Sequence, residues 1–260
     1  MSILRTLGKV FGGLIFTVSL GTLILVIALA KFTEYSTLQP SISGILASEI
    51  RKQSNPSDLQ LQLETLNAQC ADKEEVEIKL GEPIGAVNLK CSEIATATSE
   101  SLPDMVAKAI FDKIYYKEYS CSFLQCLQTL PGDEKFTVIT TGHANKFFAS
   151  IILPLEIASV VGVAIVAVSI RVWYEIAKTL GISCILIGIT YFVFPVVEQG
   201  VQKFVPPEQS SSILPVISSI FEPMRMNFLI ILVIGVLLTI AGFIGAYLQK
   251  GQKPKQETKK

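Results

Sequence analysis

Four cysteines and one carboxylate are the residues of this sequence whose types and positions could do chemistry. Cys70, Cys91, Cys121 and Cys126 share one polar segment, whereas Glu156 lies within a run of 24 residues, 147–170, that carries no other charge. Cysteine thiolates exchange disulfides and bind metals. A carboxylate inside a membrane span can carry a proton or a cation. Which of these reactions is open depends on the elements that hold the residues.

Long apolar runs dominate the chain. Half of its 260 residues are hydrophobic and only 17% are charged, against about 25% in soluble domains. A helix needs about 20 apolar residues to cross a bilayer. Four runs qualify, and they are residues 10–30, 147–170, 180–197 and 228–248. The sequence therefore predicts an all-α membrane protein with four transmembrane helices.

The first run also has features of a secretory signal. Arg5 and Lys9 precede it, and Ala28 and Ala30 have the spacing of a signal-peptidase site. The run spans 21 residues, however, and signal peptides have apolar cores of only about 7 to 15 residues. We interpret it as an uncleaved signal anchor, with cleavage as the alternative.

Charge predicts the orientation of these helices. Segments 1–9, 171–179 and 249–260 together carry nine Lys and Arg residues against two acids, whereas segment 31–146 has 11 basic and 16 acidic residues. Segment 198–227 is also slightly acidic. By the positive-inside rule, both termini and the link 171–179 are cytoplasmic. We expect a multi-pass protein of the plasma membrane with an extracytoplasmic domain, 31–146, and an outer loop, 198–227.

The four cysteines of segment 31–146 would then face an oxidising compartment, where they form two disulfides. Three pairings are possible. Cys121 and Cys126 could pair only across a turn, so we expect both to reach back to Cys91 and Cys70. Redox chemistry of the kind found in four-span quinone-linked thiol oxidases is a minor alternative, because the C-x-x-C pair of those enzymes is absent.

Segment 31–146 is predicted to be mostly helical. Apolar residues at helical spacing mark a helix over 42–50, which Pro56 ends, and a second helix from Ser57. Residues 76–80 alternate as a strand does. A third helix starts near Pro103, and residues 92–101 are predicted to be a loop.

Catalytic and cofactor motifs are absent from the sequence. It contains no G-x-S-x-G, P-loop, G-x-G-x-x-G or H-E-x-x-H pattern, and His143 is its only histidine. We therefore expect neither an enzyme nor a site for a metal, a cofactor or nucleic acid.

Small residues recur in the apolar runs at the spacing that lets helices pack closely. They predict a tight bundle or self-association, and they are Gly8, Gly12, Ala158, Gly162, Ala241, Gly242, Gly245 and Ala246. In the outer loop, the apolar stretch around Pro215 is too short to cross the membrane. It predicts a short interfacial helix, with a re-entrant segment as the alternative.

Glu156 has two interpretations. If the second span starts at residue 147, Glu156 lies about 13 Å deep, faces the helix bundle and marks a proton or cation path. If the span instead runs from Leu155 to Tyr174, Glu156 lies at the outer interface, and Arg171 and Trp173 mark the inner boundary. We favour the second interpretation.

The predicted order of two inner termini, a large disulfide-bearing outer segment and a smaller outer loop resembles claudin-type four-span proteins. The resemblance is one of topology, because the W-GLW-C-C pattern of those proteins is absent and Trp173 is the only tryptophan. Four-span large-pore channels share this topology but carry cysteines in both outer loops. We hypothesise a non-enzymatic protein whose outer domain contacts copies of itself or another envelope protein. An oligomeric channel or transporter that uses Glu156 is the principal alternative.

Overall fold

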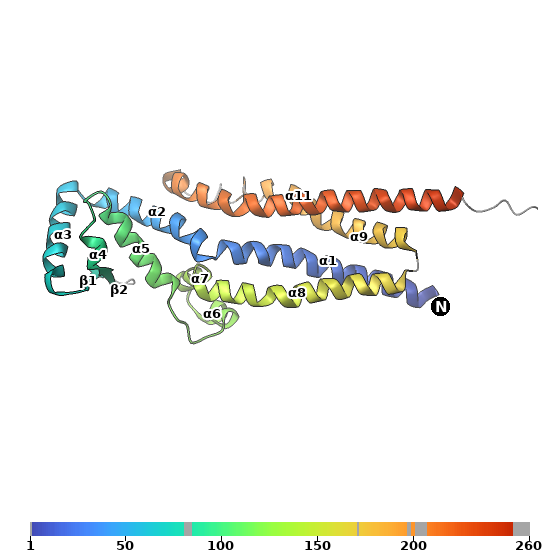
Figure 1. Ribbon diagram of the computed structural model, residues 1–260, viewed down its shortest axis with the longest axis horizontal. Helices are drawn as coiled ribbons and strands as arrows, with labels where there is room; N and C mark the ends of the chain where they lie inside the picture. The colour runs from blue at the N-terminus through green and yellow to red at the C-terminus, as the bar shows by residue number, and fades with distance from the viewer. Residues whose placement is uncertain (1, 81–84, 171, 197–198, 201–206, 252–260) are drawn as a thin grey trace, which may run out of the picture. The chain divides into compact units, whose positions relative to one another are not determined.

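The computed structural model describes residues 2–80, 85–170, 172–196, 199–200 and 207–251. The chain divides into two compact units (Figure 1): Met1–Ala28 with Phe148–Lys260, which we call the spanning unit, and Leu29–Phe147, which we call the disulfide domain. Arg171 and the basic tail from residue 252, on which part of the predicted orientation depends, lie outside the described residues.

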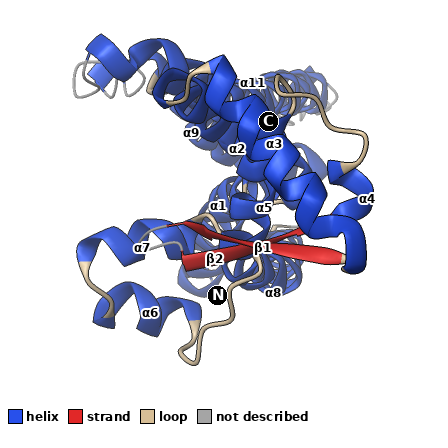
Figure 2. Ribbon diagram, turned by 90° about the vertical axis from the view of Figure 1, so that its left-hand side faces the viewer, coloured by secondary structure: helices blue, strands red, loops and turns tan. Residues whose placement is uncertain are grey.

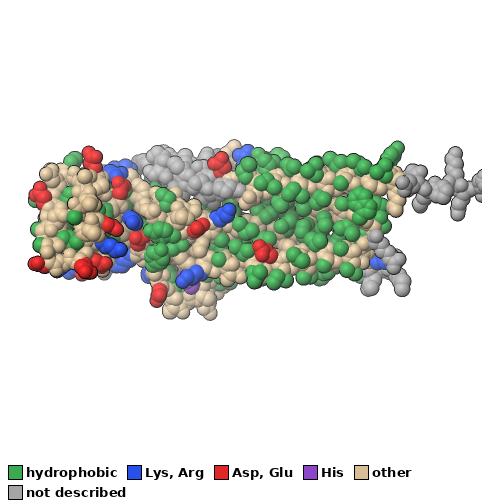
Figure 3. Space-filling model, viewed as in Figure 1, with side chains coloured by type: hydrophobic (Ala, Val, Ile, Leu, Met, Phe, Trp, Pro, Cys, Tyr) green, Lys and Arg blue, Asp and Glu red, His purple; other side chains and the backbone are tan. Residues whose placement is uncertain are grey.

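Four helices are long and apolar enough to cross a membrane, which confirms that part of the prediction. They are α1 (Ser2–Phe32), α8 (Gly142–Ser169), α9 (Trp173–Gly188) with the 3₁₀ turn η2 (Ile189–Phe192), and α11 (Pro207–Gly251). Hydrophobic side chains cover the face of these helices that Figure 3 shows, as expected of surfaces in contact with lipid.

The predicted link 171–179 is almost entirely helical, because α9 already begins at Trp173. The helix extends beyond the apolar run because apolar runs end at charged residues, whereas a helical backbone continues through them. The cytoplasmic position of this segment stays a prediction. Glu175 lies in the first turn of α9, where a negative charge complements the helix dipole. Its carboxylate also lies 3.6 Å from the Lys9 ammonium.

The predicted outer loop, 198–227, lies partly outside the described residues, and from Pro207 onward its backbone belongs to one long helix rather than to a separate short one. Helix α11 is continuous over 45 residues and includes Pro215. A proline inside a helix removes one backbone hydrogen bond and costs about 3 kcal/mol, which a helix of this length can absorb. The side chains of residues 207–220 lie outside the described part of the chain.

The disulfide domain is mostly helical and contains one β-hairpin (Figure 2). Its elements are α2 (Tyr35–Gln53), α3 (Pro56–Gln69), η1 (Cys70–Asp72), β1 (Glu75–Leu80), β2 (Gly85–Lys90), α4 (Cys91–Ile94), α5 (Leu102–Tyr115), α6 (Phe123–Thr129) and α7 (Gly132–Ile139). The predicted helices correspond to α2, α3 and α5, and the predicted strand to β1. Residues 92–94 are part of α4, so the predicted loop starts only after them.

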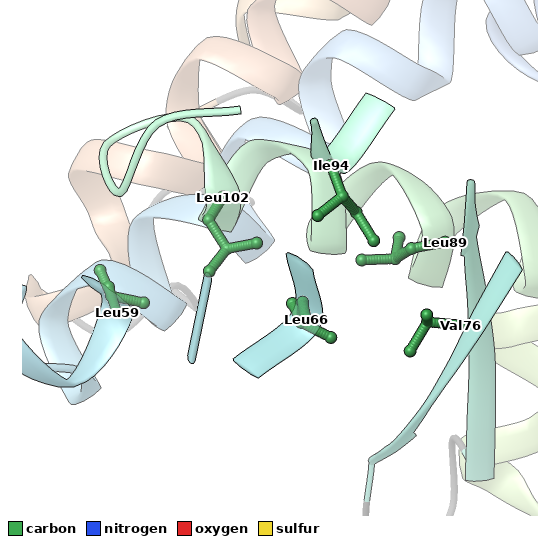
Figure 4. Close-up of a cluster of buried hydrophobic side chains, with 6 residues drawn as sticks. All are labelled: Leu59, Leu66, Val76, Leu89, Ile94 and Leu102. Carbon is green, nitrogen blue, oxygen red and sulfur yellow. The ribbon is translucent and has the colours of Figure 1, made fainter. Parts of the chain in front are cut away.

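The antiparallel strands β1 and β2 pair from Glu75 with Lys90 to Leu80 with Gly85. Gly85 has a φ of +72°, which residues with a side chain rarely adopt. The hairpin directs Val76 and Leu89 into a core with Leu59, Leu66, Ile94 and Leu102 (Figure 4). This core joins the hairpin to α3, α4 and the start of α5.

Candidate functional site

The two disulfides connect Cys70 with Cys91 and Cys121 with Cys126. The expected pairing was therefore wrong. The hairpin returns the chain to the end of α3, and the Cys91 N–H donates to the Glu74 carbonyl over 2.9 Å. Cys121 lies just before α6, where Ser122 and Gln125 form a capping box. That cap supplies the turn that a bridge between residues five apart requires.

Both disulfides lie in positions where they can stabilise the fold. Cys70 and Cys91 pack against the core of the disulfide domain, and Cys126 is fully buried. A catalytic disulfide needs a sulfur that is accessible to an attacking thiolate. The burial of Cys126 therefore favours stabilisation over thiol exchange at the second bridge.

An apolar groove of about 650 Å³ opens between α2, α3, α5 and β1 of the disulfide domain. Its apolar walls include Leu46, Ile50, Leu61, Leu66, Val106 and Ile110. Leu61 is 65% exposed, although leucine is among the residues most often buried. Glu49, Gln53, Gln62 and Lys79 add polar groups to the lining. This combination of apolar walls with a few polar groups is typical of binding sites.

Sequence reasoning missed the groove, although one signal for it was present. In the stretch LQLQL, Leu59 and Leu63 lie on the apolar stripe of α3, whereas Leu61 falls between them on a different face of the helix. A leucine outside the buried stripe is a candidate contact residue.

Polar contacts hold α2 against α5, two of the walls of the groove. The Tyr35 hydroxyl donates to Asp112 Oδ1, and Arg51 pairs with Asp104. Burial, the hydrogen bond to Asp112 and the charge of that carboxylate raise the pKa of Tyr35 to about 12. The Tyr115 hydroxyl donates to the Thr33 carbonyl over 3.0 Å, and burial raises the pKa of Tyr115. Both phenols are therefore neutral at physiological pH.

His143 lies beside Tyr119, with the ring centroids 6.0 Å apart. The His143 Nε2 and Tyr119 Oη atoms are both buried, and neither has a hydrogen-bond partner within the part of the chain that the structure describes. Among the described residues, no group of three or more His, Cys, Asp or Glu side chains could hold a metal ion. We assign no site to this pair.

The structure places Glu156 on the surface of α8, exposed rather than enclosed by the other helices. No hydrogen bond or ion pair joins its side chain to any described residue. Helix α8 ends at Ser169 and α9 begins at Trp173. The expected span from Leu155 to Tyr174 is therefore wrong, because it crosses the break between two helices.

Several of the predicted small residues lie where helices of the spanning unit touch. A Cβ atom on Gly162 of α8 would lie 2.7 Å from the Phe16 backbone nitrogen of α1, and one on Gly12 would lie 2.8 Å from the Ile165 side chain. Gly8 faces Ser169. These glycines permit close packing of α1 and α8 within one chain.

Helices α9 and α11 make the second close contact. Cβ atoms on Gly242 and Gly245 would lie 2.8 Å from atoms of Tyr174. Ala241 is exposed, and Ala158 and Ala246 are half-buried. Sequence reasoning missed Gly181, Gly188 and Gly235 at the same contact, because Gly181 and Gly188 are seven rather than four residues apart.

Comparison with protein-family models, with curated proteins and with solved structures finds no match to this chain. Its groove and its exposed carboxylate are therefore interpreted from their own chemistry.

Proposed function

We propose that this chain is a non-enzymatic, four-span protein of the plasma membrane whose disulfide domain lies outside the cytoplasm and binds an apolar segment of a protein partner in the groove. The partner is a second copy or another envelope protein. The observation that carries the proposal is the groove itself, about 650 Å³ with the largely exposed Leu61 in its wall.

Charge and cysteine chemistry support the outer location of the disulfide domain. The net positive charge of the sequence lies in segments 1–9, 171–179 and 249–260, which hold nine basic residues against two acids, and the positive-inside rule assigns such segments to the cytoplasm. The Cys70–Cys91 and Cys121–Cys126 bridges require an oxidising environment to persist. These two arguments are independent, and they favour the same side.

The shape of the groove favours a helix or an extended segment as its occupant. Three helices and a strand form its walls, and grooves between helices accept amphipathic segments through apolar anchors spaced three or four residues apart. The polar lining groups, such as Gln62 and Lys79, would hydrogen-bond to the polar edge of that segment and fix its register.

The groove is also held in a defined shape before any partner binds. Tyr35 and Arg51 of α2 bond to Asp112 and Asp104 of α5, and the Cys70–Cys91 bridge connects α3 to the hairpin. A preformed site loses less conformational entropy on binding, so the same contacts that stabilise the domain support its binding role.

Site-specific photo-cross-linking in native membranes tests this function. A photoreactive residue is placed at Leu61 in the groove or, as a matched control, at Leu124 of α6, another exposed leucine (55%) outside the groove. We expect a discrete adduct from position 61 whose cross-linked peptide, identified by mass spectrometry, is an apolar segment of a protein. Equal labelling from position 124, or no protein adduct from position 61, would refute the proposal.

A further inference from the structure

The exposed face of α8 carries a carboxylate, Glu156, that has no hydrogen-bond or ion-pair partner among the described residues of its own chain. Leu153, Ile157, Val160 and Val168 are 57–86% exposed on this helix, and Glu156 is exposed among them. Leu153, Ile157 and Val160 are three to four residues apart and Val168 lies eight residues further on, about two turns, so all four lie along one side of the helix. Such a face suits lipid, except at Glu156.

The packing of α1 against α8 shows how far along the helix axes of the spanning unit Glu156 lies. The two helices are antiparallel: Gly12 faces Ile165, Phe16 faces Gly162, and the Ser159 hydroxyl donates to Ser19 Oγ over 3.0 Å. Three residues beyond Ser159, Glu156 is level with Thr22. At 1.5 Å per residue, Thr22 lies about 20 Å from Lys9 and about 13 Å from Lys31.

Glu156 therefore lies within the uncharged layer of the unit rather than at its edge. The stretch of α1 between Lys9 and Lys31 carries no charge and is long enough to cross the hydrocarbon core. A carboxylate at this level that faces lipid is unfavourable, and such groups are normally paired or hydrogen-bonded. Since no described residue of this chain supplies that partner, a second chain is its source.

A second copy of this chain is the simplest source of that partner. Two copies inserted in the same orientation bring their Glu156 residues to the same depth, and a two-fold axis makes the same patch meet itself. None of the four apolar runs contains Lys, Arg or His, so a copy offers no intramembrane cation to Glu156. A protonated carboxyl group is both donor and acceptor, and it can therefore hydrogen-bond to its own counterpart.

We propose that two copies dimerise through the exposed face of α8, with the two Glu156 side chains hydrogen-bonded to each other across the axis and at least one of them protonated. Leu153, Ile157 and Val160 pack around this pair. The interface lies in the spanning unit and is independent of the groove, so each proposal can fail without the other.

Disulfide trapping of the full-length protein in liposomes, with no other protein present, tests the dimer. Val160→Cys on α8 is compared with Val18→Cys on α1, two valines of similar exposure (69% and 60%). Among the native cysteines, four are bonded and Cys184 is buried, so the introduced thiol is the reactive one. We expect a cross-linked dimer from position 160 and none from position 18.

Glu156 variants in the Val160→Cys background test the hydrogen bond. Glu156→Gln keeps a donor and an acceptor, and the dimer is expected to persist. Glu156→Leu suits a lipid-facing surface but loses the hydrogen bond, and the dimer is expected to weaken roughly tenfold. Equal trapping in both variants, equal trapping at positions 18 and 160, or no dimer at position 160 would overturn the proposal. Photo-cross-linking from position 61 should remain unchanged in Glu156→Leu.

Discussion

The hydroxyl of Tyr35 donates a hydrogen bond to Asp112 Oδ1 over 2.6 Å and joins two helices through residues that are 77 positions apart in the sequence. Tyr35 opens α2, and Asp112 lies in the last turn of α5. The Phe111 and Tyr115 rings pack against Tyr35 at centroid distances of 5.6 and 5.3 Å. Because α2 and α5 form two walls of the apolar groove, this contact helps to fix the spacing of those walls.

Tyr35→Phe is expected to lower the free energy of unfolding of the disulfide domain by about 1–2 kcal/mol, because the Asp112 carboxylate loses a hydrogen bond. The pKa of Tyr35 is raised on folding from 10.0 to about 12. The stability linked to this phenol is thus present below pH 10 and lost as the pH rises towards about 12. Thermal unfolding of the full chain in nanodiscs, from neutral pH to about 12, should show a smaller alkaline loss in the variant.

Tyr116→Phe is the matched control, because the Tyr116 ring is 66% exposed and stacks on Tyr35. It should leave the neutral stability nearly unchanged and reduce the alkaline loss only slightly, because the charge of Tyr116 is the smallest of the causes that raise the pKa of Tyr35. An alkaline loss in Tyr35→Phe equal to that of the unmodified protein would contradict the assigned role of the Tyr35–Asp112 bond.

The two disulfides should differ in their effect on stability. The chain-entropy relation gives about 3 kcal/mol for the Cys70–Cys91 bridge, which closes a separation of 21 residues, and about 2 kcal/mol for Cys121–Cys126, with a separation of 5. Replacing each pair with serine and measuring denaturant unfolding checks this order. Non-reducing peptide mapping provides an independent check, and a peptide linking Cys70 or Cys91 to Cys121 or Cys126 would refute the pairing.

Local patterns in the sequence predicted much of the disulfide domain. The apolar stripe at Ile42, Ile45 and Ile50 marked α2, and alternation over residues 76–80 marked β1. Strand β2 was missed although Val87 and Leu89 alternate in the same way and Gly85 precedes them. Two strand patterns on either side of a short stretch with glycine and proline predict a β-hairpin. Once β2 is recognised, Cys91 is brought near Cys70, so the pairing depended on that missed element.

Features that depend on tertiary packing could not be predicted in this way. The exposure of Glu156 depends on which side of α8 meets α1, and the Ser19–Ser159 bond and Gly162 fix that side. Helix α8 carries apolar residues on all of its sides. The periodicity of its sequence therefore does not distinguish the lipid-facing side from the packed side. For the same reason, the small residues predicted close packing without identifying their partners.

Substitutions at Leu61 and Leu66 should have different effects on partner binding and on the stability of the disulfide domain. Leu61→Glu changes an exposed side chain and is expected to shift the unfolding free energy by less than about 0.5 kcal/mol. It should nevertheless abolish capture of the partner by a photoreactive residue at Val106, which lines the same groove. Leu66→Ala empties a core position and should cost about 2–5 kcal/mol. If Leu61→Glu unfolded the domain, or left partner capture intact, Leu61 would not be a contact residue.

Gly162 should be the least tolerant glycine at the contact between α1 and α8. An added Cβ would lie 2.7 Å from the Phe16 nitrogen and 2.9 Å from its Cα, and both atoms belong to a helical backbone that cannot move aside locally. Gly162→Ala should therefore separate the two helices and destabilise the spanning unit by about 1–3 kcal/mol. Gly13→Ala on α1 is the control, because its nearest neighbour would be the Thr179 Cγ2 atom at an ordinary 3.8 Å. Alanine also has the higher helix propensity, so Gly13→Ala should be neutral or stabilising. Thermal unfolding in nanodiscs measures both variants, and equal stabilities would show that α1 and α8 do not pack through Gly162.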